Sequence, residues 1–250
     1  MRTKTYLLSN GGNDVISVTV RRAGSDDVDS VYELSLPFMN NGALIERDRG
    51  FYAAHIDDFF VIAAEGRIAA CVGVRRLAEI AEILNVAVGK EWQGRGLGQL
   101  IIVHVLAELA AEQSDDVLLF SKTTVGWFER LGFERIDQGT LPPSRLALLD
   151  ADRGSVPMRR RSARPVALTV RFARSGTERV WSDESGSLLA FAEDVGVAVD
   201  SLCWAGICGT CASPLRRGTV GYHAEPEGDP QRGEVLLCIA EPITDLLIDR

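Results

Sequence analysis

The chain has 250 residues, of which 46% are hydrophobic and 25% are charged, and this is enough to build two globular cores. Its formal net charge is −8, and residues 166–250 carry 7 basic against 13 acidic residues. An acidic chain argues against nucleic acid as a partner, because phosphates are usually met by clustered cations. The sequence contains neither an apolar run of about 18 residues nor a signal-peptide pattern, so we expect no membrane partner and a cytoplasmic location.

The first 160 residues alternate segments of strand and helix character. Apolar residues recur at helical spacing between Leu97 and Leu109, and Gly132 is suited to end a helix because it tolerates the left-handed conformation. An α/β (α+β) fold is therefore expected. In chain order the sequence predicts a strand over 15–20, a helix over 26–34, a hairpin of 59–64 and 67–74, a strand over 79–88, a helix over 97–112, a strand over 117–120 and a helix over 123–131.

A domain boundary is predicted where residues 159–166 mix four arginines with a serine and a proline. We interpret the arginine run itself as a solvated linker or the end of a strand, since charge runs are usually solvated. The predicted organisation is a first domain over 1–160, a linker over 161–165 and a second domain over 166–250. Within the second domain we expect paired strands over 166–172 and 178–181 and a short helix over 187–195.

A glycine-rich turn joins the strand that ends at Val88 to the helix that begins at Leu97. Glycines let backbone N–H groups approach an anion at the start of a helix, so the turn suits a pyrophosphate, to which Arg95 adds positive charge. The spacing of Gly94, Gly96 and Gly98 lacks the sixth-position glycine or alanine of a dinucleotide fingerprint, which disfavours that alternative.

The pattern Gln93-x-x-Gly96-x-Gly98 after Val86–Val88, together with 127–133, resembles the acyl-CoA signature of the GNAT N-acetyltransferase superfamily. The resemblance covers roughly residues 14–160. It implies acetyl-CoA as cosubstrate and a bent strand whose backbone at Val86 and Val88 lines the pantetheine arm. The turn that would hold the pyrophosphate consists of Gln93, Gly94, Arg95, Gly96, Leu97 and Gly98.

Within this superfamily the chain is most similar to the amino-acid N-acetyltransferases such as N-acetylglutamate synthase. The similarity implies that the acceptor is the α-amino group of a small, glutamate-like amino acid. The segments that carry it are 42–47, 81–88, 119–124, 127–133 and 141–155.

Acetyl transfer needs an unprotonated amine, and because an α-amino group has a pKa near about 8, a positioned base helps. Glu82 matches the family's strand glutamate, which accepts a proton through water; the alternative is a solvent-facing or ion-paired acid. Many relatives protonate the leaving thiolate with a tyrosine, but this chain has Phe128 there. Ser121 matches a hydroxyl that could serve instead, or it bonds locally at a strand end.

A free amino acid brings at least one carboxylate, which arginine recognises through two parallel hydrogen bonds. Arg47, Arg145 and Arg153 are the candidate substrate-binding residues, with a surface role as the alternative for each. Relatives often have a basic residue where this chain has Glu46, so the resemblance alone does not establish glutamate specificity.

Four of the five cysteines follow residue 200 in the pattern C-x4-C-x2-C with one distant cysteine. This spacing favours a metal centre over disulfides in a chain without an export signal, and it differs from the paired ligands of a structural zinc site, which remains the alternative. Cys71 stands apart in an apolar stretch and is interpreted as a small core residue. The four candidate ligands are Cys203, Cys208, Cys211 and Cys238.

The cysteine segment resembles the β-grasp domain of plant-type ferredoxins over residues 166–250, which implies a 2Fe-2S cluster. Gly206 and Gly209 let backbone N–H groups turn toward the sulfurs, and Trp204 replaces the polar residue common in that family. Two functions stay open. The first is an N-acetyltransferase with a cluster for redox sensing or electron transfer. The second is a ferredoxin-type electron carrier in which the CoA-binding domain serves as a docking or regulatory module. Under either, a redox partner protein is a candidate partner.

Overall fold

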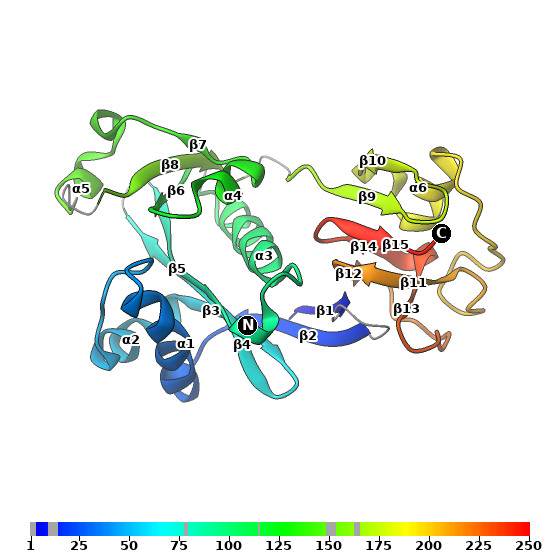
Figure 1. Cartoon of the computed structure of the whole chain (residues 1–250), viewed down its shortest axis with the longest axis horizontal. Coiled ribbons are helices and arrows are strands. Elements are labelled where there is room, and N and C mark those ends of the chain that lie inside the picture. The colour runs from blue at the N-terminus through cyan, green and yellow to red at the C-terminus, as the bar shows by residue number, and fades with distance from the viewer. Residues whose placement is uncertain (1–3, 10–14, 78–79, 115, 149–153, 163–165) are drawn as a thin grey trace. The chain divides into compact units, whose positions relative to one another are not determined.

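The computed structural model describes residues 4–9, 15–77, 80–114, 116–148, 154–162 and 166–250. The chain divides into two compact units. Among the described residues, the first consists of those within Val20–Trp92 and Ile101–Val166, and the second of those within Lys4–Thr19, Gln93–Leu100 and Ala167–Arg250. Figure 1 traces the chain order of their elements. Among the described residues, no helix combines the length and the apolar character that a membrane span needs.

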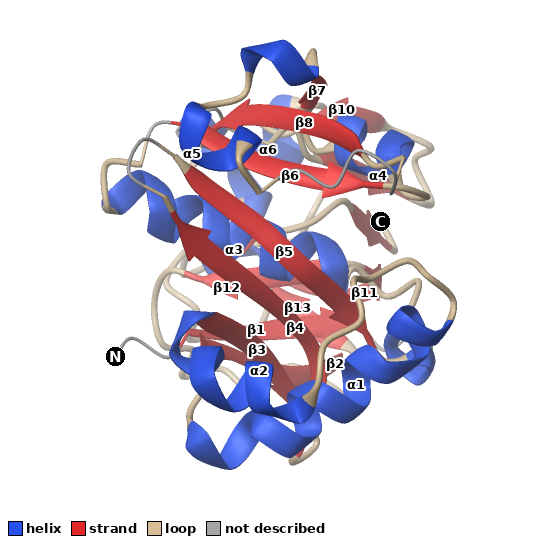
Figure 2. Ribbon diagram, turned by 90° about the vertical axis from the view of Figure 1, so that its left-hand side faces the viewer, coloured by secondary structure: helices blue, strands red, loops and turns tan. Residues whose placement is uncertain are grey.

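The first unit is built on a mixed sheet that contains the strand order β3-β4-β5-β6-β8-β7 (Figure 2). Strand β4 is antiparallel to both β3 and β5, β6 runs parallel to β5, and β8 is antiparallel to both β6 and β7. Strand β2 (Val15–Arg22), whose last residues belong to this unit, precedes β3 in the order. The bounds are Phe59–Ala64 for β3, Arg67–Arg76 for β4, Ala81–Val88 for β5, Asp116–Ser121 for β6, Glu134–Arg135 for β7 and Val156–Arg161 for β8.

Helices α1 (Val28–Asn40) and α2 (Arg49–His55) pack against β4 and β5 and share one apolar core with them. Tyr52 and Phe59 are among the largest fully buried side chains, and Cys71 lies in the same core, which confirms its interpretation as a core residue. The other helices are α3 (Leu97–Ala111), α4 (Val125–Arg130) and α5 (Pro143–Leu146), with 3-10 turns at Ser25–Asp27, Ile56–Asp58, Lys90–Trp92 and Gln138–Thr140.

The second unit holds a mixed sheet in the order β10-β9-β15-β11-β13, in which β9 and β15 are parallel and the other pairs antiparallel. Strands β1, β12 and β14 pair antiparallel in the same unit. Helix α6 (Leu188–Asp194) begins at Ser187, whose hydroxyl accepts from the Ala190 N–H at 3.2 Å, as expected of an N-cap. The bounds are Lys4–Ser9 for β1, Thr169–Phe172 for β9, Glu178–Val180 for β10, Ala212–Arg217 for β11, Thr219–Tyr222 for β12, Glu234–Leu236 for β13, Ala240–Pro242 for β14 and Leu246–Ile248 for β15; 3-10 turns lie at Asp183–Ser185 and Leu237–Ile239.

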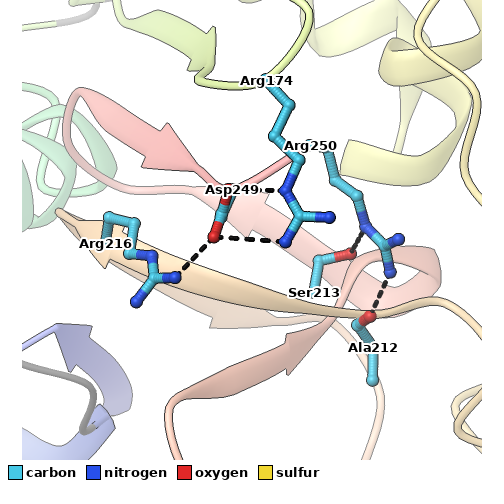
Figure 3. Close-up of polar contacts among 6 residues, drawn as sticks. All are labelled: Arg174, Ala212, Ser213, Arg216, Asp249 and Arg250. Carbon is cyan, nitrogen blue, oxygen red and sulfur yellow. Dashed lines mark hydrogen bonds and ion pairs between the residues drawn. The ribbon is translucent and has the colours of Figure 1, made fainter.

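The last two residues of the chain tie β15 to its neighbours (Figure 3). The Asp249 carboxylate accepts from Arg174 at 2.8 Å and also pairs with Arg216, while Arg250 donates to the Ser213 hydroxyl at 2.9 Å and to the backbone of Ala212. Hydrogen bonds from Arg174 and then Arg216 lower the pKa of Asp249 to about 2. The C-terminal strand is thus fixed by charge-assisted bonds that start from the ends of β9 and β11.

Most predicted elements are present, and the differences lie at their ends. The helix predicted over 26–34 runs to Asn40, and the strand predicted over 79–88 is observed from Ala81, residue 79 lying outside the described part. The arginine run, interpreted as a linker or a strand end, supplies the last three residues of β8, and Arg160 is buried with its Nε donating to the Leu131 carbonyl at 2.8 Å. The sequence did not predict strands β1, β7 and β11 to β15 or helices α2 and α5, and it indicated β8 only through the strand-end interpretation of the arginine run.

Candidate functional site

A pocket of about 150 Å³ lies in the first unit beside the middle of β5. Three guanidinium groups and one carboxylate give it its charge: Arg47, Arg75 and Arg145 against Glu82. Phe120, from β6, supplies an apolar wall. The remaining lining residues are Ala43, Leu44, Ile45, Ile83, Leu84, Asn85, Leu148 and Ser155.

Glu82 is the buried charge of this pocket, with 4% of its surface exposed. Arg75 lies opposite it in the β4–β5 register, and both Arg75 and Arg145 pair with the same oxygen, Oε2, the latter at 2.9 Å. Two cations compensate one buried anion, which a buried carboxylate needs. Because both ion pairs end on Oε2, Oε1 is the oxygen left for a proton or a water molecule.

Arg145 is the more buried of the two arginines, with 7% of its surface exposed. Its guanidinium stacks on the Phe120 ring at 4.0 Å, a contact that holds the plane of the fork in place. Its Nη1 atom is buried and has no hydrogen-bond partner. A buried donor without a partner costs free energy, so this atom marks the place where an acceptor from a ligand would be favourable.

Of the other two predicted substrate-binding residues, the structure describes only one. Arg47 lines the pocket with its guanidinium 3.9 Å from the centre of the Phe51 ring, whereas Arg153 lies outside the described residues. Glu46, the departure from the family pattern, is exposed. Arg75 was not singled out from the sequence, although its place opposite Glu82 follows once the β4–β5 register is known.

Ser121, the predicted proton donor, ends β6 and is 6% exposed. Its hydroxyl accepts from the Thr124 N–H at 3.2 Å and shares a hydrogen bond with the Thr124 hydroxyl at 2.9 Å. This is the local bonding that served as the alternative for this residue. When Thr124 donates in the shared bond, the Ser121 proton is left for another acceptor.

Strand β5 changes course just beyond Glu82. Its parallel pairing with β6 ends at the pair Ile83–Leu119, and two residues of β5, Asn85 and Val86, then stand opposite one residue of β4. Such an insertion is a β-bulge, which bends a strand away from its neighbour. Val86, within the bulge, and Val88, beyond it, are half-buried in the part of β5 that does not pair with β6.

The glycine-rich turn has the backbone that its sequence predicts. Gly94 and Gly96 adopt φ values of +77° and +92°, and the Leu100 N–H donates to the Gly96 carbonyl at 2.9 Å as the first bond of α3. Leu97 is buried and anchors the helix start, while Gln93 and Gly94 are exposed. The first amides of a 15-residue helix carry a partial positive charge that suits an anion, and Arg95 and Gly98 complete this turn.

The second candidate site is the cysteine loop of the second unit, where all four cysteines are free thiols. Cys203 Sγ accepts backbone N–H bonds from Ala205 at 3.5 Å, Ile207 at 3.4 Å and Cys208 at 3.4 Å. Those bonds lower the pKa of the Cys203 thiol to about 6. Amide donors on sulfur are the environment that stabilises a thiolate ligand.

The distant cysteine joins the loop through Gly206. The Gly206 N–H donates to Cys238 Sγ at 3.3 Å, and its φ of +72° is a conformation in which glycine is favoured. A Cβ at Gly206 would lie 2.7 Å from Ile239 Cδ1. Among the described residues no three His, Cys, Asp or Glu side chains are grouped to hold a single metal ion. The four cysteine sulfurs, with amide donors to Cys203 and Cys238, are a donor set that fits a 2Fe-2S cluster, whose two irons share four thiolates.

Two families with known members match different parts of the chain. Residues 55–135 match the acetyltransferase (GNAT) domain family, and residues 172–242 match the family of 2Fe-2S iron-sulfur cluster binding domains. The chain therefore carries a segment of the GNAT acetyltransferase type followed by a segment of the 2Fe-2S cluster binding type.

Individual relatives of the first domain are amino-acid acetyltransferases. The chain is 31% identical to that of Escherichia coli (strain K12) over 140 residues, which are 54% of this chain and 31% of the relative. It is 27% identical over 130 residues to that of Neisseria meningitidis serogroup A, covering 51% of this chain and 30% of the relative. The chain thus spans about a third of the length of these relatives.

Among solved structures, the chain is similar to N-acetylglutamate synthase from Neisseria gonorrhoeae complexed with coenzyme A and N-acetyl-glutamate. The TM-score is 0.57 and the sequence identity 26%, over 59% of this chain and 35% of that one. The same enzyme complexed with coenzyme A and L-arginine gives a TM-score of 0.53 at 26% identity.

Proposed function

We propose that this chain transfers the acetyl group of acetyl-CoA to the α-amino group of a small, glutamate-like amino acid. The observation that carries the proposal is the pocket in which buried Glu82 is flanked by Arg75 and Arg145. Its excess of cations suits a ligand with one or two carboxylates. Relatives that bear the name amino-acid acetyltransferase, and a similar structure complexed with coenzyme A and N-acetyl-glutamate, support the same acceptor class.

In this proposal the carboxylate of the acceptor accepts from Nη1 of Arg145, a buried donor that has no hydrogen-bond partner. A bidentate contact between guanidinium and carboxylate fixes both the position and the direction of the acceptor. Arg47 is the candidate for the second carboxylate of a glutamate-like acceptor. Arg153 keeps its proposed role as a further substrate-binding residue.

The chemical step forms one bond and breaks one. The amine nitrogen attacks the thioester carbonyl, its proton passes to Oε1 of Glu82 through water, and the C–S bond breaks as the amide forms. The departing CoA thiolate takes up a proton, for which Ser121 is the candidate donor, and solvent returns a proton to the Ser121 oxygen. The pantetheine arm follows Val86 and Val88, and the pyrophosphate binds at the turn 93–98, as the GNAT resemblance implies.

The experiment is to incubate anaerobically purified protein, with its cluster intact, with acetyl-CoA and each common amino acid, and to follow free CoA. Release with glutamate or glutamine that is lost in Glu82→Gln supports the proposal. If CoA binds but no amino acid gives release, the acceptor is another amine or the chain is an electron carrier with a CoA-binding module.

The second domain is proposed to use its cluster in redox sensing or electron transfer. A 2Fe-2S cluster held by the four thiolates takes up and gives back one electron. Cys208 is exposed and Leu202, Trp204 and Ile207 are 76%, 46% and 52% exposed on the same loop, which favours contact with a redox partner protein. Equal acetylation rates for oxidised and reduced protein would exclude redox control of the transferase.

A further inference from the structure

The bulge in β5 is made by a residue type that rarely adopts its conformation. Asn85 has a φ of +53°, in the left-handed region. Only glycine enters that region without a steric cost, although asparagine tolerates it better than other residues do. A backbone held in this conformation inside a strand needs support from the surrounding structure.

That support comes from two helices through the Asn85 side chain. The Tyr52 hydroxyl of α2 donates to Asn85 Oδ1 at 2.8 Å, and Asn85 Nδ2 donates to the Ser35 hydroxyl of α1 at 2.9 Å. Ser35 in turn donates to the Val31 carbonyl at 2.8 Å, and Cys71 Sγ lies 3.7 Å from Asn85 Nδ2. We call Tyr52, Ser35 and Asn85 the bulge network.

The directions of these hydrogen bonds determine the orientation of the Asn85 side-chain amide. Because Ser35 uses its proton on Val31, it can only accept from Asn85, which assigns Nδ2 to Ser35 and Oδ1 to Tyr52. Tyr52 and Ser35 are fully buried and Asn85 is 8% exposed. Since a buried polar group that loses its partner bears the full cost of desolvation, this network resists any change in the direction of the side chain.

The bulge network acts where the two halves of the proposed reaction meet along β5. On one side of Asn85 lies Glu82, with its carboxylate in the pocket, and on the other side lie Val86 and Val88 in the part of β5 that does not pair with β6. The φ angle of Asn85 sets the direction of the strand between them. A rotation there moves the carbonyl and N–H groups of the later residues relative to the Glu82 carboxylate.

We infer that Asn85 is a positioning residue, held by Tyr52 and Ser35, that aligns the acyl thioester bound along Val86–Val88 with the acceptor amine beside Glu82. This inference rests on the proposed acetyl transfer. The side-chain amide of Asn85 does not act on the substrate; it acts through the backbone that it holds. The network is therefore part of the catalytic geometry as well as part of the core.

The test compares Asn85→Ala and Tyr52→Phe with Val61→Ala as a matched control. Val61 is fully buried in the same core but belongs to β3 and makes no side-chain hydrogen bond, so its truncation lowers stability without disturbing the network. For each variant, the Kd of CoA is measured by titration calorimetry and the melting temperature by scanning calorimetry. The kcat and KM are measured with the acceptor. The Kd does not depend on the identity of the acceptor.

We expect Asn85→Ala to weaken CoA binding at least fivefold and to lower kcat at least tenfold. Tyr52→Phe keeps the ring and should give a smaller loss in the same direction, whereas Val61→Ala should change both quantities less than twofold despite its lower melting temperature. Asn85→Gly should recover part of the CoA affinity, because glycine adopts φ +53° without strain.

A Kd and kcat within twofold of wild type in both Asn85→Ala and Tyr52→Phe, with only the melting temperature lowered, would reduce the network to a stabilising role and overturn the inference. Should Asn85→Ala fail to fold, Tyr52→Phe decides alone. If wild-type protein acetylates no amino acid, the acceptor proposal fails, while the CoA affinities still test the positioning role.

Discussion

Replacing Glu82 by glutamine separates the chemical role of this residue from its structural role. Glutamine keeps an oxygen that can accept from Arg145, but it removes the negative charge and the ability to take a proton. The two guanidinium groups then face each other without the carboxylate between them. The change therefore acts on acetyl transfer and on stability at once, and the two effects have different sizes.

The stability effect follows from the burial of the partners. Breaking a fully buried ion pair costs about 3 to 5 kcal/mol, but the Arg75 side chain is 37% exposed and can turn to solvent. We therefore expect a loss of about 1 to 3 kcal/mol, or roughly 2 to 10 °C in melting temperature for a chain of this size. The kinetic effect should be larger, because a general base contributes about 10²- to 10⁴-fold to the rate.

The assay is CoA release at saturating acetyl-CoA with the best acceptor found. Glu82→Gln should lower kcat at least about 100-fold while the KM of acetyl-CoA changes less than about threefold. Glu33→Gln, on the exposed face of α1, is the matched control and should leave kcat and melting temperature unchanged. A kcat within threefold of wild type, combined with the expected loss of stability, would mean that Glu82 only holds the arginines in place.

Three further predictions concern single side chains. Arg145→Lys should raise the KM of the acceptor about 10- to 100-fold with a smaller change in the KM of acetyl-CoA, since lysine cannot reproduce the bidentate contact; equal changes in both constants would contradict this. Gly206→Ala should lower the iron and sulfide content per chain, because its Cβ would lie 2.7 Å from Ile239 Cδ1. Gly209→Ala is the control, because Gly209 is also left-handed but has open space around it, so that only the backbone strain of about 1 to 2 kcal/mol is added. An equal loss of iron and sulfide in both variants would exclude the contact with Ile239 as the cause. Asp249→Asn should lower stability by about 0.5 to 2 kcal/mol at pH 7 through its two surface ion pairs, and because the folded pKa of about 2 lies below the unfolded one of about 3.9, the difference from wild type should fade as the pH drops from about 5 to 2 in urea titrations.

The features that the sequence alone predicted are those in which the spacing of residues in a short motif determines the local backbone conformation. The spacing of Cys203, Cys208 and Cys211 and the glycines of the turn 93–98 fix local backbone shape, and the matching families agree with both. Periodicity likewise located the helix at 97–112 and the hairpin at 59–74.

The features that sequence did not give arise from pairing between distant segments. Arg75 became part of the pocket because the β4–β5 register sets it opposite Glu82, and no local pattern states that register. Strand β8 was only partly predicted, because its three arginines were interpreted as a solvated linker or the end of a strand; Arg160 is in fact buried and donates to the Leu131 carbonyl. A charged side chain can be buried when a hydrogen-bond or ion-pair partner lies beside it, and such a partner is identified only from the three-dimensional structure.

Both candidate sites depend on backbone that departs from regular geometry, but the sequence indicates only part of it. In the cysteine loop Gly206 and Gly209 are left-handed, as glycine allows, whereas Trp204 adopts a φ of +56° that its residue type does not suggest. In β5 the same region of φ is occupied by Asn85, one of only two polar residues in the apolar run Ala81–Val88, the other being Glu82. Asn85, held by two buried hydrogen-bond partners, interrupts the regular pairing of β5 with β4. The resulting bend sets the direction of the residues on either side of it. A polar interruption of a buried strand is therefore a signal for a functional bend, and here it lies three residues from the proposed base.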